Sequence, residues 1–432
     1  MLEILPPGRF GEELGSIAHD DRRAELKDSR GLGSRFGRLL TAAAISNLGD
    51  GVGGVAFPLL VATLTRDPLQ VAGVTFALQL PWFLMAVISG ALVDRMDRRR
   101  VMVITDLVRG GIVVGLAVAV GAGMVNLPVL YLAAFALGLA ETFFDPASEA
   151  IVPSLVARDQ LATANGRRQA AEFVGNSFAG PPLGAVLFGF MAALPFYFDA
   201  ATFFVAAALV AALTGSFRAE RAVITTLRAD VGEGLRWLLR HRVLRTLASM
   251  AGITNLFGTA IVSVFVLFAQ DILGVSEFGY GVLLTAIGLG GLTGAFVAPL
   301  IVRRLGQGTT AQSTILAQAV LAILAGSLSN PYLTGVILFG YGVLITTWNT
   351  VSVTLRQSLT PDQLRGRVAG AARLLAWGSQ PIGAVLGGVI AKAAGLRAPF
   401  FVAAAAWMLL AAGTVRIINN RTIDEASAEA VA

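Results

Sequence analysis

The sequence contains no cysteine and only two histidines, His19 and His241. Without cysteine the chain cannot form disulfides, thiolate metal sites or a cysteine nucleophile, and two separated histidines cannot form a histidine-rich metal site. Charge is scarce as well, because only 14% of the 432 residues are charged, whereas 55% are hydrophobic. This composition and a mean hydropathy of +0.73 predict a polytopic membrane protein. We therefore expect no metal, no cofactor and no enzymatic activity.

Charges are missing from several long stretches, and these stretches predict membrane-spanning helices. A helix needs about 20 apolar residues to cross a bilayer. Five uncharged runs have about this length: Ala200–Phe217, Thr246–Gln270, Phe278–Val302, Leu374–Ala391 and Ala398–Val415. Two longer runs, 110–140 and 305–355, must fold back at the turn residues of 121–128 and 327–331. With the remaining runs, the sequence predicts twelve spanning helices.

The arginines are distributed unevenly over the loops of this twelve-helix arrangement. One side receives arginine-rich loops throughout, including seven arginines from Arg218 to Arg245, whereas the other side holds only Arg66, Lys392 and Arg397. The positive-inside rule therefore predicts that the arginine-rich loops and both chain ends are cytoplasmic, in a multi-pass protein of the cell inner (plasma) membrane. The net charge of +6 then reflects orientation rather than a nucleic-acid partner.

The two halves of the chain repeat one another at offsets of 199 to 208 residues. Ile45-Ser-Asn-Leu48 recurs as Ile253-Thr-Asn-Leu256, and Pro182-Leu-Gly-Ala-Val-Leu187 recurs as Pro381-Ile-Gly-Ala-Val-Leu386, with two further matches in order between them. This pattern indicates two copies of a six-helix unit in the same orientation. The expected divisions are a disordered cytoplasmic tail at 1–36, six-helix bundles at 37–217 and 246–418, a cytoplasmic linker at 218–245 and a cytoplasmic tail at 419–432.

The linker contains apolar residues at helical spacing, opposite three of its arginines. These are Leu227, Val231, Leu235 and Leu238. The pattern predicts an amphipathic helix in the cytoplasmic interface, anchored to anionic lipid, with a regulatory partner site as the alternative.

A short basic loop separates the second and third predicted spans. It reads Gly90-Ala-Leu-Val-Asp94-Arg95-Met-Asp97-Arg98-Arg-Arg. The loop resembles the signature loop of the major facilitator superfamily of transporters, with Asp97 where that family usually has glycine. With the repeat, the resemblance implies the major facilitator fold, an all-α polytopic membrane protein of twelve transmembrane helices in two six-helix repeats. It also implies that Asp94 closes the cytoplasmic side against the start of span 11, braced by Arg95 and Arg98.

The fifth predicted span is rich in glycine and proline, from Gly175 through Gly180-Pro181-Pro182 to Gly184-Ala185. Such a run bends a helix and allows close packing. These structural effects alone would explain the glycines and prolines. It also resembles the span-5 motif of antiporters and exporters in the superfamily, with Ala185 where glycine is usual. The resemblance implies a secondary active exporter similar to the macrolide-efflux and siderophore-exporter branch of the drug:proton antiporters. The expected gating residues are Gly90, Asp94, Arg95, Arg98, Arg109, Gly180, Pro181 and Gly184.

Acidic residues in the spans are candidates for proton coupling, because an ionisable group in hydrocarbon is costly unless paired or wetted. The first copy holds six of them, whereas the second is nearly free of acids, and Arg373 is its main charge. We expect coupling at Asp50, which lies near mid-bilayer between glycines, at Glu141 and at Asp145. Two alternatives are a structural network of Asp106, Arg109 and Asp145, and a role for Asp50 in binding a cationic substrate or in structure alone. Asp199 is expected at the membrane interface.

Aromatic and amide side chains near mid-membrane are candidates for the substrate cavity, although most of the aromatics could equally serve packing. They are Asn47, Phe57, Phe76, Gln79, Trp82, Asn255, Phe257, Trp348 and Asn349. The expected partners are a small hydrophobic or amphipathic compound, protons and membrane lipid, and a monomer is expected. A proton-coupled importer of a small metabolite and a non-transporting sensor or scaffold are the alternatives. The sequence has no P-loop, which argues against an ATP-driven pump.

The topology predicts which single cysteines an impermeant reagent reaches in intact cells. Cysteines replacing Asn126, Glu277 or Ser329 should be labelled from outside, and those replacing Arg99, Arg236 or Asp362 should not. The cysteine-free chain is its own control. Labelling of Arg99→Cys from outside would contradict the arrangement.

Overall fold

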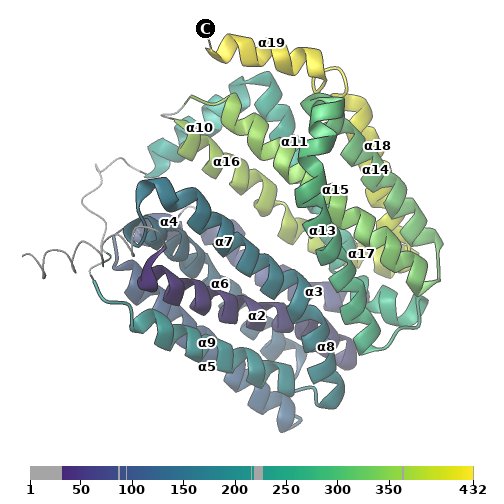
Figure 1. Ribbon diagram of the computed structural model, residues 1–432. Coiled ribbons are helices and arrows are strands. Elements are labelled where there is room, and N and C mark those ends of the chain that lie inside the picture. The colour runs from purple at the N-terminus through teal and green to yellow at the C-terminus, as the bar shows by residue number, and fades with distance from the viewer. Residues whose placement is uncertain are drawn as a thin grey trace, which may run out of the picture.

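The computed structural model describes residues 32–85, 88–93, 95–215, 217, 227–361 and 364–431. These residues form two helical bundles that face one another (Figure 1). The N-terminal bundle contains α2 (Gly33–Leu64), α3 (Pro68–Met85), α4 (Ile88–Val93), α5 (Arg98–Gly121), α6 (Leu127–Ile151), α7 (Leu161–Phe173), η3 (Val174–Ala179), α8 (Gly180–Phe190) and α9 (Leu194–Ala211). The C-terminal bundle contains α11 (Arg242–Val262), α12 (Phe265–Leu267), η4 (Phe268–Ile272), α13 (Glu277–Leu305), α14 (Gln307–Ser327), α15 (Pro331–Ser358), α16 (Arg365–Gly378), α17 (Gln380–Ala394) and α18 (Ala398–Thr414).

The expected number of membrane spans is confirmed within the described residues. Ten helical segments are long and apolar enough to cross a membrane, and α11 with α12 and η4 forms an eleventh that bends by 43°. The shorter apolar helix α18 is the twelfth. The ends of the bundles differ slightly from expectation, because α2 begins at Gly33, and the helix α19 (Asn420–Val431) forms in the expected C-terminal tail.

The twelve spans give the molecule two faces. We call the face that carries the loops 152–160, 305–307 and 358–365 and the helix α19 the basic face, because the arginine-rich loops lie there. The opposite face carries the turns at 65–67, 122–126, 191–193, 273–276, 328–330 and 395–397. The signature loop lies on the basic face. Asp94 lies outside the described residues, whereas Asp97 accepts a hydrogen bond from the backbone N–H of Arg100 at 3.1 Å and caps α5. Asp97 therefore has a structural role at the start of α5.

The internal repeat is visible in the packing of equivalent helices. In the N-terminal half, Gly184 of α8 approaches α2 so closely that a Cβ atom would lie 2.6 Å from the carbonyl oxygen of Val52. In the C-terminal half, a Cβ atom on Gly383 of α17 would overlap the carbonyl oxygen of Leu256 in α11. These are repeat-related positions, so both copies use glycine to bring the fifth helix of the bundle against the first.

The two halves contact one another mainly toward the opposite face. Helix α13 lies against η3 and α8, where a side chain on Gly281 would overlap Ala185, and one on Gly288 would overlap the Ser177 carbonyl group. In the symmetric position, a Cβ atom on Gly388 of α17 would lie 2.8 Å from the Cα atom of Leu69 in α3. One continuous apolar core, which includes Leu60 and Phe265, joins both halves here. The halves are therefore closed against each other on this side.

Two ion pairs join the halves at the opposite face. Lys392 at the end of α17 contacts Asp67 at 2.5 Å, and Arg66 contacts Asp271 at 3.3 Å and the side-chain oxygen of Gln270 at 2.7 Å. The hydrogen bond from Lys392 lowers the pKa of Asp67 below its usual range. We call these two ion pairs the latch.

The linker helix α10 (Leu227–Arg240) lies beside α16 (Figure 1). Leu238 is buried against Val368 and Ala371 of α16. A side chain on Gly234 would overlap the carbonyl oxygen of Arg367, and the side chain of Glu233 forms an ion pair with Arg367. The part of the apolar face of α10 that contains Leu235 and Leu238 therefore packs against the C-terminal bundle. The expected position of the linker in the cytoplasmic interface stays a prediction.

The latch predicts a measurable shift between conformations. Replacing Asp67 by Asn should raise the population open at the opposite face by a factor of about 1.4 to 5, because an exposed ion pair stabilises by about 0.2–1 kcal/mol. Spin labels on Asn126→Cys and Ser329→Cys would report the separation of the two halves. Since the pKa of Asp67 is lowered, the latch is present above the ordinary aspartate pKa and is lost as the pH falls through the lowered value. The distance distribution should therefore not change with pH near neutrality.

Glu277→Gln is the matched control, because Glu277 lies on the opposite face at the start of α13 and makes no ion pair among the described residues. Identical distance distributions for Asp67→Asn and the parent would contradict the role of the latch.

Candidate functional site

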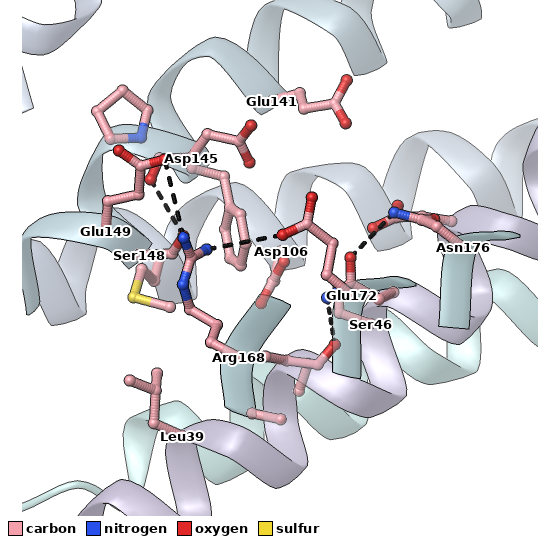
Figure 2. A pocket seen from close by; sticks show the side chains of 18 of the residues that line it. Leu39, Ser46, Asp106, Glu141, Asp145, Ser148, Glu149, Arg168, Glu172 and Asn176 are labelled. Carbon is pink, nitrogen blue, oxygen red and sulfur yellow. Dashed lines mark hydrogen bonds and ion pairs between the residues drawn. The ribbon is translucent and has the colours of Figure 1, made fainter. Parts of the chain in front are cut away.

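A cavity of about 440 Å³ lies between the halves on the side of the basic face. We call it the acidic cavity, because six carboxylates and three arginines line it. The carboxylates belong to Asp50, Asp106, Glu141, Asp145, Glu149 and Glu172. Most of the wall comes from α2, α5, α6 and α7 of the N-terminal half, and α16 contributes Arg373 and Trp377. Figure 2 shows Glu141 and Asp145 on the same side of this cavity, with Arg168 between Glu149 and Glu172.

Arg109 of α5 is the central cation of this wall. Its side chain is 4% exposed and contacts Asp50 of α2 at 2.6 Å and Asp106, one turn earlier on α5, at 3.6 Å. The guanidinium also lies over the ring of Phe203, 4.2 Å from its centroid, and near Phe144, at 5.2 Å. A guanidinium can be buried when its charge is paired and its faces stack on aromatic rings. The pairing of Asp106 with Arg109 agrees with the expected structural network, but Asp50 takes the place that Asp145 had in it.

We call Arg109 and the carboxylates around it the Arg109 cluster. Asp199 also belongs to this cluster, which reasoning from the sequence missed. It is 3% exposed on α9, and its carboxylate lies in a groove of α2, where side chains on Gly49 or Gly53 would collide with it. The expected position at the membrane interface is therefore wrong. The spacing of Gly49 and Gly53, four residues apart on one face of a helix, is the signal in the sequence that could have indicated a buried partner.

Glu141 and Asp145 lie one helical turn apart on α6 and differ from Asp50 in having no partner. Both side chains are partly exposed to the acidic cavity, and neither makes a hydrogen bond or ion pair among the described residues. Nearer the basic face, Arg168 contacts Glu149 at 3.8 Å and Glu172 at 4.0 Å. The N-terminal wall therefore has paired charges at both ends and unpaired carboxylates between them.

The acidic cavity continues into two further cavities. The central cavity, of about 340 Å³, shares Asp50, Arg109, Glu141 and Asn176 with it and is otherwise mainly apolar, closed by residues of both halves such as Phe57 and Tyr280. The C-half cavity, of about 390 Å³, shares Gln169, Arg373 and Trp377 with the acidic cavity. Trp377 also contacts Trp82 of α3 edge-on, with 5.1 Å between centroids. The three cavities thus form one cleft from the basic face to the middle of the molecule.

Most of the expected cavity residues line this cleft. Those that do are Asn47, Phe57, Gln79, Trp82, Asn255, Trp348 and Asn349. Phe76 and Phe257 line none of these three cavities in the described part of the chain. Phe257 instead packs against the core of the C-terminal bundle, because its side of α11 is in contact with other helices.

The expected gating residues have different environments. Gly180 contacts Gly51 of α2 so closely that a Cβ atom would lie 2.6 Å from its Cα atom, and Pro181 follows the irregular turn η3 at the start of α8. Gly90, in contrast, has open space where a side chain would lie. Arg95 is exposed, and Arg98 donates its backbone N–H to Phe217 at 3.4 Å. Their roles in gating stay predictions.

Comparisons with known proteins agree with this architecture. A family model described as "Transmembrane secretion effector" matches residues 33–431. The multidrug efflux pump Tap of Mycolicibacterium fortuitum is 31% identical over 407 residues, which cover 90% of this chain and 97% of the relative.

Solved structures show the same fold at low identity. The nucleoside transporter NupG has a TM-score of 0.71 at 12% identity, covering 89% of this chain and 99% of its own. A bacterial homologue of the iron transporter ferroportin has a TM-score of 0.70 in its inward-facing state, at 18% identity over 91% of this chain and 98% of its own. The outward-facing state of the ferroportin homologue has a TM-score of 0.58, at 20% identity over 92% of this chain and 100% of its own. These neighbours share the fold of this chain.

The Arg109 cluster predicts an asymmetry between two substitutions. Arg109→Gln should lower the free energy of unfolding by about 3–5 kcal/mol, because it leaves buried carboxylates without a counter-charge. Asp50→Asn should cost only about 1–2 kcal/mol, since Asp106 still pairs with Arg109. The combined variant should be less destabilised than the sum, as expected for residues in contact.

Denaturant titrations in detergent micelles would measure these differences. Arg303→Gln on the exposed end of α13 is the control and should stay within about 0.5 kcal/mol of the parent. Strictly additive effects of Arg109→Gln and Asp50→Asn would contradict the pairing.

Proposed function

This chain belongs to the transmembrane secretion effector family of the major facilitator superfamily, and we propose that it exports a small hydrophobic or amphipathic compound, drug or siderophore-like, in exchange for protons. The likeness to the multidrug efflux pump Tap supports the direction of transport and the kind of substrate. Membership of a transporter family also favours transport over an enzymatic or scaffolding role.

The observation that carries the proposal is the cleft between the halves. It extends from the basic face to mid-molecule, and its carboxylates lie on the N-terminal wall, next to the mainly apolar central cavity. An apolar cavity with a few charged groups is the kind of site that holds an amphipathic ligand. Because Glu141 lines both the acidic and the central cavity, it is placed to contact both water and substrate.

The coupling proton is assigned first to Glu141, with Asp145 one turn away. Asp50, the first expectation from the sequence, is paired with Arg109 at 2.6 Å, so proton exchange at this carboxylate would have to break that ion pair. Glu141 and Asp145 make no ion pair among the described residues and are partly exposed to the acidic cavity, so a proton can reach or leave them without breaking an ion pair.

Alternating access follows from the contacts between the halves. In the present state the latch and the glycine contacts of α13 and α17 close the opposite face. Opening that face requires these contacts to separate and the cleft to close at the basic face, where the signature loop with Asp94, Arg95 and Arg98 would meet the start of α16. Gly180, Pro181 and Gly184 would serve as the bending point of the fifth span.

We also propose that the protein lies in the cell inner (plasma) membrane as a monomer, with the basic face and both chain ends in the cytoplasm. The arginine-rich loops support this orientation by the positive-inside rule. The arginines of those loops would contact anionic lipid headgroups. In this orientation the inward-facing cleft is open to the cytoplasm, where an exporter collects its substrate.

Proton coupling predicts a separation between two transport assays. In proteoliposomes loaded with a compound to which the chain confers resistance in a drug-sensitive host, Glu141→Gln should retain exchange of that compound. Its pH-driven accumulation should fall about tenfold, within the range of a coupling free energy of 1–3 kcal/mol. Asp50→Asn should reduce both activities, because it disturbs the pair with Arg109.

Glu277→Gln, at the start of α13 on the opposite face, is the control and should leave both activities unchanged. Full pH-driven accumulation by Glu141→Gln and by Asp145→Asn would show that neither residue carries the proton. Failure of the parent to confer resistance to any compound would contradict export itself.

A further inference from the structure

The four arginines of the cleft fall into two classes. Arg109 and Arg168 belong to the N-terminal half, and each contacts two carboxylates. Arg356 of α15 and Arg373 of α16 belong to the C-terminal half, and neither makes an ion pair among the described residues. The guanidinium of Arg373 lies over the aromatic ring of Trp377, at 5.7 Å from the centroid.

Both of these arginines line the C-half cavity, and Arg373 also lines the acidic cavity. The C-half cavity is lined by Arg356 and Arg373 together with hydrogen-bonding side chains, and none of its described lining residues is a carboxylate. Asn255 donates its amide to the carbonyl oxygen of Ala376 at 2.9 Å, which fixes its orientation. Two guanidiniums in a cavity whose described lining has no carboxylate provide donors in excess of acceptors, which is the arrangement that binds an anionic oxygen group.

We propose that the C-half cavity is an anion-binding subsite formed by Arg356 and Arg373, so that the cleft takes an amphoteric substrate. The cationic part of the substrate faces Glu141 and Asp145, and a carboxylate or similar acidic group faces the two arginines. This proposal rests on the proposed export function and specifies its substrate class.

Three features of the cleft support one molecule bridging both walls. The acidic and C-half cavities share Arg373, Trp377 and Gln169, so a ligand filling one reaches the other. Their volumes, about 440 and 390 Å³, lie within the range of drug-sized sites. Trp82 and Trp377 meet where the halves approach, and they offer aromatic faces to the middle of such a molecule.

The alternative role for Arg373 is to pair with Glu172 or Glu149 when the cleft closes at the basic face. That role predicts a loss of transport that is the same for every substrate. The amphoteric subsite predicts instead that Arg373 distinguishes ligands by their acidic group. Equilibrium binding separates the two, because it needs neither a proton gradient nor closure of the cleft.

The test uses rhodamine B and its ethyl ester. The two dyes share one permanently cationic ring system, and at neutral pH only rhodamine B also carries a carboxylate. Fluorescence anisotropy with the purified full-length protein in lipid nanodiscs should show the parent binding rhodamine B about tenfold more tightly than the ester, as expected for one charge-assisted hydrogen bond. Arg373→Gln should remove this preference by weakening rhodamine B alone, and Arg356→Gln should reduce it.

Two further variants keep the result interpretable. Arg373→Lys retains the charge and should recover part of the preference, and Arg416→Gln, an exposed arginine outside the cleft, should keep all of it. Equal affinities of the parent for the two dyes, or no binding of rhodamine B, would overturn the proposal, as would an equal loss of both dyes in Arg373→Gln. None of these outcomes bears on export itself, which the resistance assay tests with compounds chosen without regard to charge.

Discussion

The N-terminal half depends on the burial of a single guanidinium among several carboxylates. Arg109 is held by Asp50 and Asp106 and covered by the rings of Phe203 and Phe144, so helices α2, α5, α6 and α9 are tied to one charge. A charge of this kind cannot be moved into hydrocarbon without its partners, so these contacts hold the four helices together. The unpaired acids of α6 lie at the edge of this rigid cluster, where water reaches them.

The C-terminal half is built by the same repeat but carries different chemistry. Its helices repeat the close glycine packing of the first half, as the equivalent contacts of Gly184 and Gly383 show. Its cavity presents arginines and amides in place of acids. A transporter assembled from two copies of one unit thus has two walls of opposite charge, and rocking one against the other changes which charges the cleft exposes.

Much of this structure could be predicted from the sequence, because the membrane constrains the hydropathy of whole spans and the distribution of arginines between the loops. The twelve helices, the repeat and most of the cavity residues follow from such long-range patterns. Asp199 could not be placed, because its distance from the start of a span does not show that Gly49 and Gly53 provide a groove for it. The packing of α10 on α16 could not be predicted for a similar reason, since an amphipathic pattern does not distinguish a lipid surface from a neighbouring helix. Both are tertiary contacts between distant segments.

The two ion pairs of the latch also make the protein sensitive to the ionic strength of the surrounding medium. Arg66, Lys392 and Asp271 are each 42–56% exposed, so dissolved salt reaches these contacts directly. The Debye length is about 8 Å at physiological ionic strength and about 30 Å in dilute medium. In the proposed orientation these contacts face the medium outside the cell, while the Arg109 cluster is shielded within the bundle. The balance between the two conformations should therefore follow the salinity of the surroundings, although the substrate cleft itself is insulated from it.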